Sequence, residues 1–191
     1  PMDKGQGDPV RAGVISCGVS PALTNREAKL LRSAAIASRR TLAPVMVQLP
    51  TFKAVTLALV TEALSLLQSA GADLKRACLV VAGMSLRSLG ADMSSFGQLL
   101  AETGASACIG GMGLSDTWVD ASDSGREGPV RLPGDDEIAD GLAALIAKGL
   151  SEHLLLSTGI CMALQRQQHG GHGLAHSQTF LPRLLSARGV E

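Results

Sequence analysis

The sequence alternates, five times in succession, between a short apolar run and a longer segment with helical periodicity. The apolar runs are too short for helices and rich in residues that favour strands, so we expect buried strands at 12–17, 44–49, 77–82, 105–111 and 153–157. Thr24 and Glu27 have the spacing of a capping box, which predicts the start of the first helix. Strands that alternate with helices in this way predict a parallel sheet with right-handed crossovers.

The segments between the strands define the rest of the expected organisation. Helices are predicted at about 24–40, 53–70, 89–102, 135–148 and 175–187. Residues 113–134 contain many glycines and aspartates and are predicted to form one long loop. Residues 1–10 are polar and are expected to be a flexible N-terminal segment, so that 11–191 form a single α/β domain.

Composition excludes several classes of protein. The formal net charge is zero, and the chain has no tyrosine and one tryptophan, so we expect no binding to nucleic acid. No apolar run approaches the ~18 residues of a membrane span, so no membrane association is expected. The four cysteines are far apart and lack a Cys-x-x-Cys spacing, which predicts reduced core residues in a cytoplasmic protein.

Two architectures fit five βα units. One is a five-stranded doubly wound parallel sheet, and the other is part of a TIM (β/α)8 barrel. A whole barrel takes about 250 residues and eight units, whereas this chain has 191 residues. The pattern alone therefore favours the doubly wound sheet.

The end of the chain carries a set of short motifs in a fixed order. They are Leu154-Leu155-Leu156-Ser157, Gly170-Gly171-His172-Gly173, Phe180 with Pro182-Arg183-Leu184, and Arg188-Gly189-Val190. In this order they closely resemble the C-terminal end of the phosphotriesterase family, including the phosphotriesterase-related proteins. Weaker matches extend the resemblance back to about residue 11. The resemblance implies a partial barrel that corresponds to strands four to eight, and it reverses the choice between the two architectures.

The resemblance also implies a chemistry, which is hydrolysis assisted by two divalent metals, usually zinc. Family members hold these metals with side chains on strands one, four, five, six and eight. The positions that match strands four, five, six and eight are Ser16, Gln48, Val81 and Gly159. Valine and glycine offer no donor, and serine and glutamine are weak neutral ligands. We therefore expect no metal cofactor, and the catalytic residues stay unknown.

Three other residues are candidates for a pocket at the carboxyl ends of the strands: His172, Trp118 and Cys17. His172 would either line the pocket or tie its glycine-rich loop together through hydrogen bonds. Cys17 would either pack in the core or act as a thiol nucleophile, which would need a neighbouring base. His169 and His176 are expected to be solvated.

These observations support a phosphotriesterase-related protein that is inactive or divergent by the family mechanism, in other words a pseudoenzyme. The alternatives are an active hydrolase completed by a separate N-terminal half, and a small-molecule or protein binding module. Five strands cut from a barrel leave two sheet edges, and unpaired edges attract partners. The expected partner is therefore a second copy in a homodimer, or a complementary N-terminal half-barrel.

Overall fold

The computed structural model describes residues 12–114, 118–120, 129–160 and 163–190. Its main sheet has five strands: β1 (Ile15–Gly18), β2 (Val45–Gln48), β3 (Ala77–Ala82), β4 (Ser106–Gly110) and β7 (Leu154–Leu156). All neighbouring strands are parallel, and their order in the sheet is β1-β2-β3-β4-β7. The segment 1–10, expected to be flexible, lies outside the described residues.

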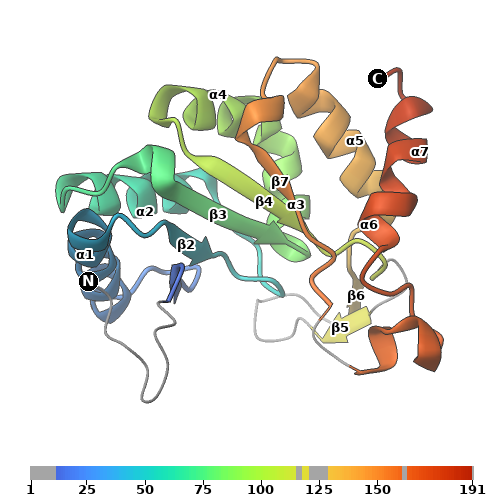
Figure 1. Ribbon diagram of the computed structural model, residues 1–191, viewed down its shortest axis with the longest axis horizontal. Coiled ribbons are helices and arrows are strands. Elements are labelled where there is room, and N and C mark those ends of the chain that lie inside the picture. The colour runs from blue at the N-terminus through green and yellow to red at the C-terminus, as the bar shows by residue number, and fades with distance from the viewer. Residues whose placement is uncertain (1–11, 115–117, 121–128, 161–162, 191) are drawn as a thin grey trace.

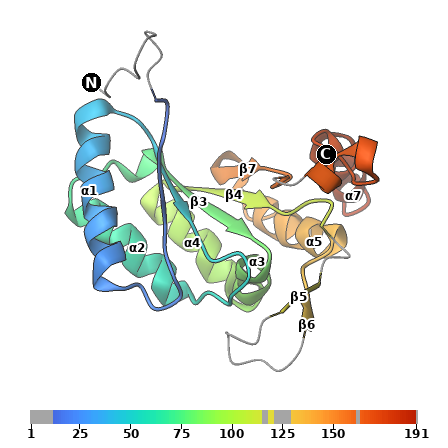
Figure 2. The same ribbon diagram turned by 90° about the horizontal axis from the view of Figure 1, so that it is seen from below.

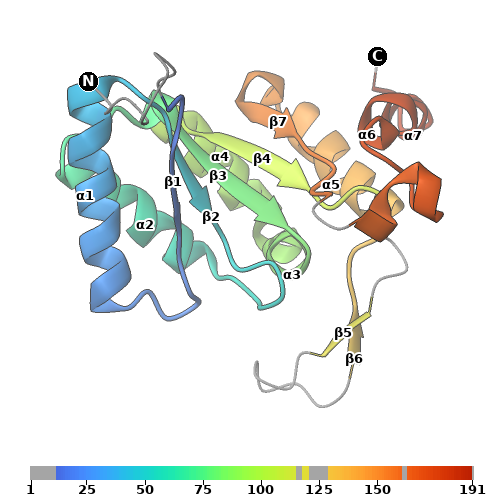
Figure 3. The ribbon, with the colours of Figure 1, turned by 60° about the horizontal axis from the view of Figure 1, so that its bottom comes forward.

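The helices are α1 (Asn25–Thr41), α2 (Leu57–Ser69), α3 (Met84–Leu89), α4 (Met93–Thr103), α5 (Asp135–Ile146), α6 (His176–Thr179) and α7 (Leu181–Ser186). Helices α1 to α5 lie between the strands in the chain and cover one face of the main sheet (Figures 1 and 3), and α6 and α7 follow the last strand. Short 3₁₀ turns lie at η1 (Leu74–Arg76), η2 (Gly90–Asp92), η4 (Ser151–His153), η5 (Ala163–Gln165) and η6 (Gln167–His169). Figure 1 shows the arrangement, and Figure 3 shows the sheet in front with α2 and α4 behind it.

The strand order decides between the two architectures expected from the pattern. A doubly wound sheet reverses its strand order at a switch point and carries helices on both faces. Here the order follows the sequence without a reversal, and helices α1–α5 lie on one face (Figures 1 and 3). The doubly wound alternative is therefore wrong, and the chain has an α/β fold built on a parallel sheet of sequential order.

The core lies between the sheet and this layer of helices. Alternate residues of a strand point to opposite faces, and one set is almost free of solvent contact: Val45, Val47, Ala77, Leu79, Val81, Ala107 and Ile109. Helices α1, α2 and α4 contribute Leu31, Leu64 and Phe96 to the same cluster. The other face of the sheet has no helix over it in the described part of the chain (Figure 3), and we call it the open face.

The first helix begins as its sequence predicts. Thr24 is the N-cap, and its side chain and that of Glu27 form the reciprocal hydrogen bonds of a capping box. The third helical segment differs from the prediction, because α3 begins already at Met84 and is separated from α4 by the 3₁₀ turn at 90–92. The helix predicted at 135–148 is α5, whose N-cap is Gly134, and the Gly134 N–H donates to the Glu137 carboxylate at 2.8 Å.

The segment 113–134 is not a plain loop. It contains two short strands, β5 (Trp118–Asp120) and β6 (Pro129–Arg131), which pair antiparallel. They project from the main body beyond the end of α5 (Figure 2). Strands of three residues are too short to produce a periodic signal in the sequence. Within the described residues, every helix is too short or too polar to span a bilayer.

Candidate functional site

The open face carries two of the four positions that match the family's metal ligands. Ser16 lies on β1 and Gln48 on β2, and both side chains are exposed. Their chain neighbours Cys17 and Val47 pack into the core beneath the helices. Because successive side chains of a strand point to opposite faces, Ser16 and Gln48 point away from the helices. The Gln48 side chain donates to the carbonyl oxygen of Leu49 at 3.0 Å. This bond uses the amide nitrogen of Gln48, so the atom left to meet a metal is the amide oxygen, which is a weak neutral ligand.

Val81 lies on the other face of the sheet. It is fully buried in the cluster beneath the helices, and it pairs in register with Ile109 of β4. The residues of β3 that share the open face with Ser16 and Gln48 are Cys78, Val80 and Ala82, and the two that flank Val81 are Val80, the register partner of Gln48, and Ala82. Val81 therefore cannot line the same face as Gln48, and its open-face neighbours are hydrocarbon as well.

Gly159 follows β7 at the carboxyl end of the sheet. Its φ of +65° lies in the left-handed region, and its N–H donates to the Ser157 hydroxyl at 3.2 Å. A Cβ at this position would lie 3.4 Å from the Gly111 nitrogen, at the end of β4. The position therefore serves a tight turn, and glycine presents no ligand atom there.

These residues do not fit a pair of divalent metal ions. Divalent metals in hydrolases are held by imidazole, carboxylate or thiolate groups. The structure offers a hydroxyl at Ser16, a neutral amide oxygen at Gln48, and no side-chain ligand atom at Val80, Ala82 or Gly159. Among the described residues, no three histidine, cysteine, aspartate or glutamate side chains lie together as a metal-binding group.

Cys17 does not line a pocket. It packs in the core on the helix-covered face, and its thiol points towards the Met46 carbonyl oxygen at 3.7 Å. Burial raises the pKa of the Cys17 thiol, which disfavours the thiolate that a nucleophile needs. Trp118 is 62% exposed on β5, opposite Arg131, and does not belong to the described lining of the pocket beside His172.

A buried pair between Asp135 and His176 was missed by the sequence analysis. Asp135 is the first residue of α5, and its Oδ2 lies 2.6 Å from Nε2 of His176, with both side chains only 10% exposed. The other carboxylate oxygen, Oδ1, accepts the N–H of Gly113 at 2.7 Å. The expectation that His176 is solvated is therefore wrong, because the pair ties the last loop of the chain to α5 and to the segment after β4.

His172 lies beside this pair, in the Gly170-Gly171-His172-Gly173 loop. Its ring is 4.4 Å from the His176 ring, which also stacks on Phe180 at 5.1 Å. The loop needs its glycines, because a Cβ at Gly171 would lie 2.3 Å from the backbone of Gln165. His172 itself is exposed, and it lines a pocket of about 430 Å³ together with Arg131, Gly134, Asp135, Asp136, Glu137, His176 and Phe180.

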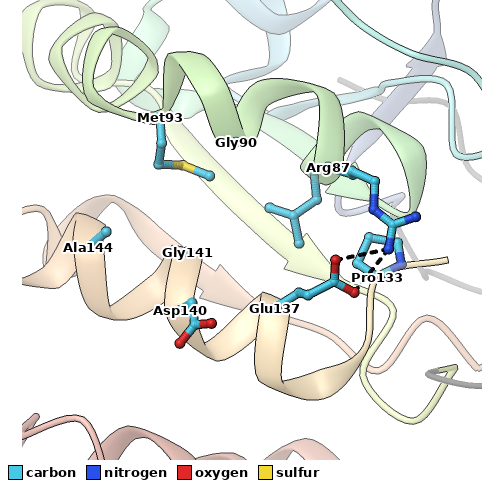
Figure 4. A pocket seen from close by; sticks show the side chains of 9 residues that line it. Arg87, Gly90, Met93, Pro133, Glu137, Asp140, Gly141 and Ala144 are labelled. Atoms are coloured by element: carbon cyan, nitrogen blue, oxygen red, sulfur yellow. Dashed lines mark hydrogen bonds and ion pairs between the residues drawn. The ribbon is translucent and has the colours of Figure 1, made fainter.

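A second pocket, of about 380 Å³, lies between the helices. Figure 4 shows Arg87 of α3 reaching across it to Glu137 of α5, with Met93 and Ala144 towards the other end. Both carboxylate oxygens of Glu137 lie 2.9 Å from one guanidinium nitrogen of Arg87. Apart from these two charges and the carboxylate of Asp140, the residues that line the pocket are apolar.

The C-terminal segment is fixed to α5 by ion pairs. Arg188 bonds Asp140 at 2.5 Å and lies 3.5 Å from the Asp136 carboxylate, and the bond to Asp140 contributes most to raising the pKa of the guanidinium. Figure 2 shows α7 beside α5 in this arrangement. The shared motif residues at the end of the chain therefore hold the last βα unit together.

The fold agrees with what the chain is similar to. A parallel sheet of sequential order with one layer of helices is compatible with the (β/α)8 barrel architecture. The sequence model of the phosphotriesterase family matches residues 3–191. The chain belongs to the phosphotriesterase family.

Three individual proteins show how similar this chain is to its relatives. N-acetyltaurine hydrolase of Dictyostelium discoideum is 29% identical over 168 residues, which is 87% of this chain and 42% of that protein. A resiniferatoxin-binding protein from Rhodobacter sphaeroides matches 97% of the chain with a TM-score of 0.77 and 27% identity. The phosphotriesterase homology protein of Escherichia coli, with phosphate in its active site, has a TM-score of 0.74 at 24% identity and shows the fold alone. The chain spans 48% and 58% of these two structures, about half their length.

Proposed function

We propose that this chain is a phosphotriesterase-family protein whose own residues do not build the metal-dependent hydrolytic centre of the family. Its five strands would correspond to strands four to eight of the barrel. The sequential strand order and the match to about half of each relative support this correspondence. The observation that carries the proposal is the absence of a strong metal donor at Ser16, Gln48, Val80, Ala82 and Gly159.

The proposed difference from active relatives lies in the metal ligands, and the parallel sheet forms without them. Metal-assisted hydrolysis needs a cation to activate water and to polarise the scissile group, and a site short of anionic or imidazole ligands does not hold such a cation tightly. The hydrolytic activity in the name of the Dictyostelium relative would therefore be missing from this chain when it stands alone. This makes it a pseudoenzyme or a binding protein of the family.

A hydrolysis assay tests this proposal. The purified chain, supplied with zinc or manganese, is expected to turn over paraoxon, an aryl ester, a lactone and N-acetyltaurine no faster than buffer. A catalytically active family member serves as the positive control under the same conditions. A rate that a chelator abolishes and added metal restores would contradict the proposal.

The edges of the sheet support a second part of the proposal, which concerns partners. In the described chain, β1 pairs only with β2 and β7 only with β4. On β7, Leu155 and Leu156 are 52% and 49% exposed. A few hundred Å² of such apolar surface at ~25 cal/mol/Å² corresponds to several kcal/mol, which favours covering it.

We propose that a second copy of the chain or a complementary N-terminal half-barrel covers these edges. Light scattering during size exclusion at micromolar concentration is expected to give a mass above that of one chain. A second sample also contains the first three βα units of a full-length relative. A mixed complex in that sample would indicate the half-barrel, and an unchanged mass would indicate the homodimer. A compact monomer that unfolds cooperatively and binds no hydrophobic dye would contradict both. Hydrolysis that appears only in the mixed complex would instead favour an active enzyme assembled from two halves.

A further inference from the structure

Two cysteines face each other across neighbouring strands of the open face. In β3 and β4 the register pairs Cys78 with Ser106 and Val80 with Cys108, so the cysteines are two residues apart along the strands. The chain neighbours of Cys78 and Cys108 pack in the core under the helices. Because successive side chains of a strand point to opposite faces, both cysteines lie on the open face. Both are free thiols, and their residues are 8% and 9% exposed.

The two thiols are diagonal neighbours on the same face of the sheet, and each affects the ionisation of the other. The interaction with Cys108, aided by burial, raises the pKa of Cys78. The same interaction, working against burial, lowers the pKa of Cys108 to about 7. Cys108 is therefore the thiol that loses its proton first, and thiolates are the form of cysteine that binds metals.

A third sulfur atom belongs to the next strand. Met46 of β2 is the direct register partner of Cys78 and lies partly exposed on the same face. Three adjacent strands thus present Met46, Cys78 and Cys108 side by side, with two thiols and one thioether. Soft sulfur ligands of this kind select Cu(I), whereas a structural zinc site takes four ligands, commonly cysteine and histidine.

We propose that Cys78 and Cys108, with Met46 beside them, bind a single Cu(I) ion on the open face of the sheet. The copper enters as Cu(I), so no electron is transferred. The two thiols release their protons to solvent as their sulfur atoms bond the metal. Met46 and Cys78 lie two residues nearer the amino ends of their strands than Gln48 and Val80, and Cys108 lies level with Val80. None of the three sulfur residues stands at a position that matches the family's metal ligands.

The test is an anaerobic titration of the reduced full chain with Cu(I), in competition with the chromophoric chelator bicinchoninate. One Cu(I) per chain is expected. Cys78→Ser and Cys108→Ser are each expected to weaken binding by about 100-fold or more, since losing a ligand costs at least as much as losing a group that orients one. Met46→Leu is expected to weaken it less. The matched control is the Cys17→Ser/Cys161→Ser double variant, which keeps the pair and is expected to bind within about threefold of the wild type.

Two results would overturn the proposal. One is a control variant that loses Cu(I) as fully as Cys78→Ser. The other is a Cys78→Ser/Cys108→Ser variant that binds like the wild type. X-ray absorption at the copper edge of the wild-type protein provides a measurement that does not depend on how the variants fold. A first shell of sulfur supports the site, and a shell dominated by nitrogen or oxygen contradicts it.

Discussion

The two faces of the central sheet are built from the same strands and have opposite characters. On the helix-covered face, Val47, Leu79 and Ile109 are almost fully removed from solvent. On the open face, Gln48 and Val80, which pair in register, are partly or fully exposed. The difference indicates that the first face stabilises the fold, while the second can change its chemistry without loss of the fold. Metal ligands can therefore disappear from one face of a sheet that still folds from the other.

The largest expected effect is a loss of stability in the Leu79→Ala variant, compared with Val80→Ala on the opposite face of the same strand. Leu79→Ala removes a fully buried side chain from the cluster under α2 and α4, and should lower the free energy of unfolding by about 2–5 kcal/mol. Val80→Ala, one residue along on the open face, should cost less than about 1.5 kcal/mol. Urea unfolding followed by circular dichroism measures both. Equal losses for the two variants would contradict the division between the faces.

The second prediction concerns the rim where β3 turns into α3. Gly83 has a φ of +58°, and a Cβ there would lie 2.4 Å from the carbonyl oxygen of Thr51. That oxygen also accepts the Met84 N–H at 2.7 Å, so it cannot move freely. Gly83→Ala should therefore destabilise by about 2 kcal/mol or more. Gly90→Ala is the control, because a Cβ there meets open space, and its unfolding midpoint should stay the same or rise.

The third prediction tests the pair that fixes the last loop to the helix layer. His176→Ala leaves the buried Asp135 carboxylate without its 2.6 Å partner and should cost about 1–3 kcal/mol. The exposed neighbour His172, changed to Ala, should cost less than about 0.5 kcal/mol. A double-mutant cycle with Asp135→Ala should give a coupling energy of about 1 kcal/mol or more. Strictly additive losses would show that the two side chains do not stabilise each other.

The smallest expected effect is a change in the pKa of Glu137 in helix α5. Burial would raise the pKa of Glu137, but the Gly134 N–H and then the Arg87 and Arg131 guanidinium groups outweigh it and lower that pKa. A folded-state pKa below the unfolded value of about 4.3 stabilises the protein above that pH, and this contribution disappears as the pH falls through the folded-state pKa. Arg87→Met should therefore move the Glu137 pKa upward in a carboxyl NMR titration.

Glu27 is the internal control for that titration. Its carboxylate is held by Thr24 and Ser20 at the other end of the molecule, so Arg87→Met should leave its titration unchanged. A Glu137 pKa that does not respond to the substitution would contradict the role of Arg87.

The sequence predicts the elements that depend on local signals. The strand at 77–82 agrees with β3 to the residue, since a β-rich apolar run is bounded by polar residues on one side and glycine on the other. The capping box at Thr24 is equally local. The short pair β5–β6 was missed, because each strand has three residues, which are too few to show a periodicity.

The candidate site was harder to predict, for two physical reasons. Strands of a parallel sheet can be apolar on both faces, so the run 77–82 does not indicate that Val81 points to the core and Val80 away from it. Asp135 and His176 are 41 residues apart, and only the fold brings them together. A weak signal was nevertheless present, since both residues adjoin segments that resemble the family.

The central claim is that the open face and its carboxyl rim hold no pair of divalent metals with the residues of this chain. The most direct measurement is the metal content after incubation with excess zinc or manganese and removal of the loosely bound fraction, determined by inductively coupled plasma mass spectrometry. The account predicts less than one tightly bound zinc or manganese per chain, unchanged by Gln48→Ala. Two tightly bound metals per chain, lost on substitution of Gln48 or Ser16, would contradict it.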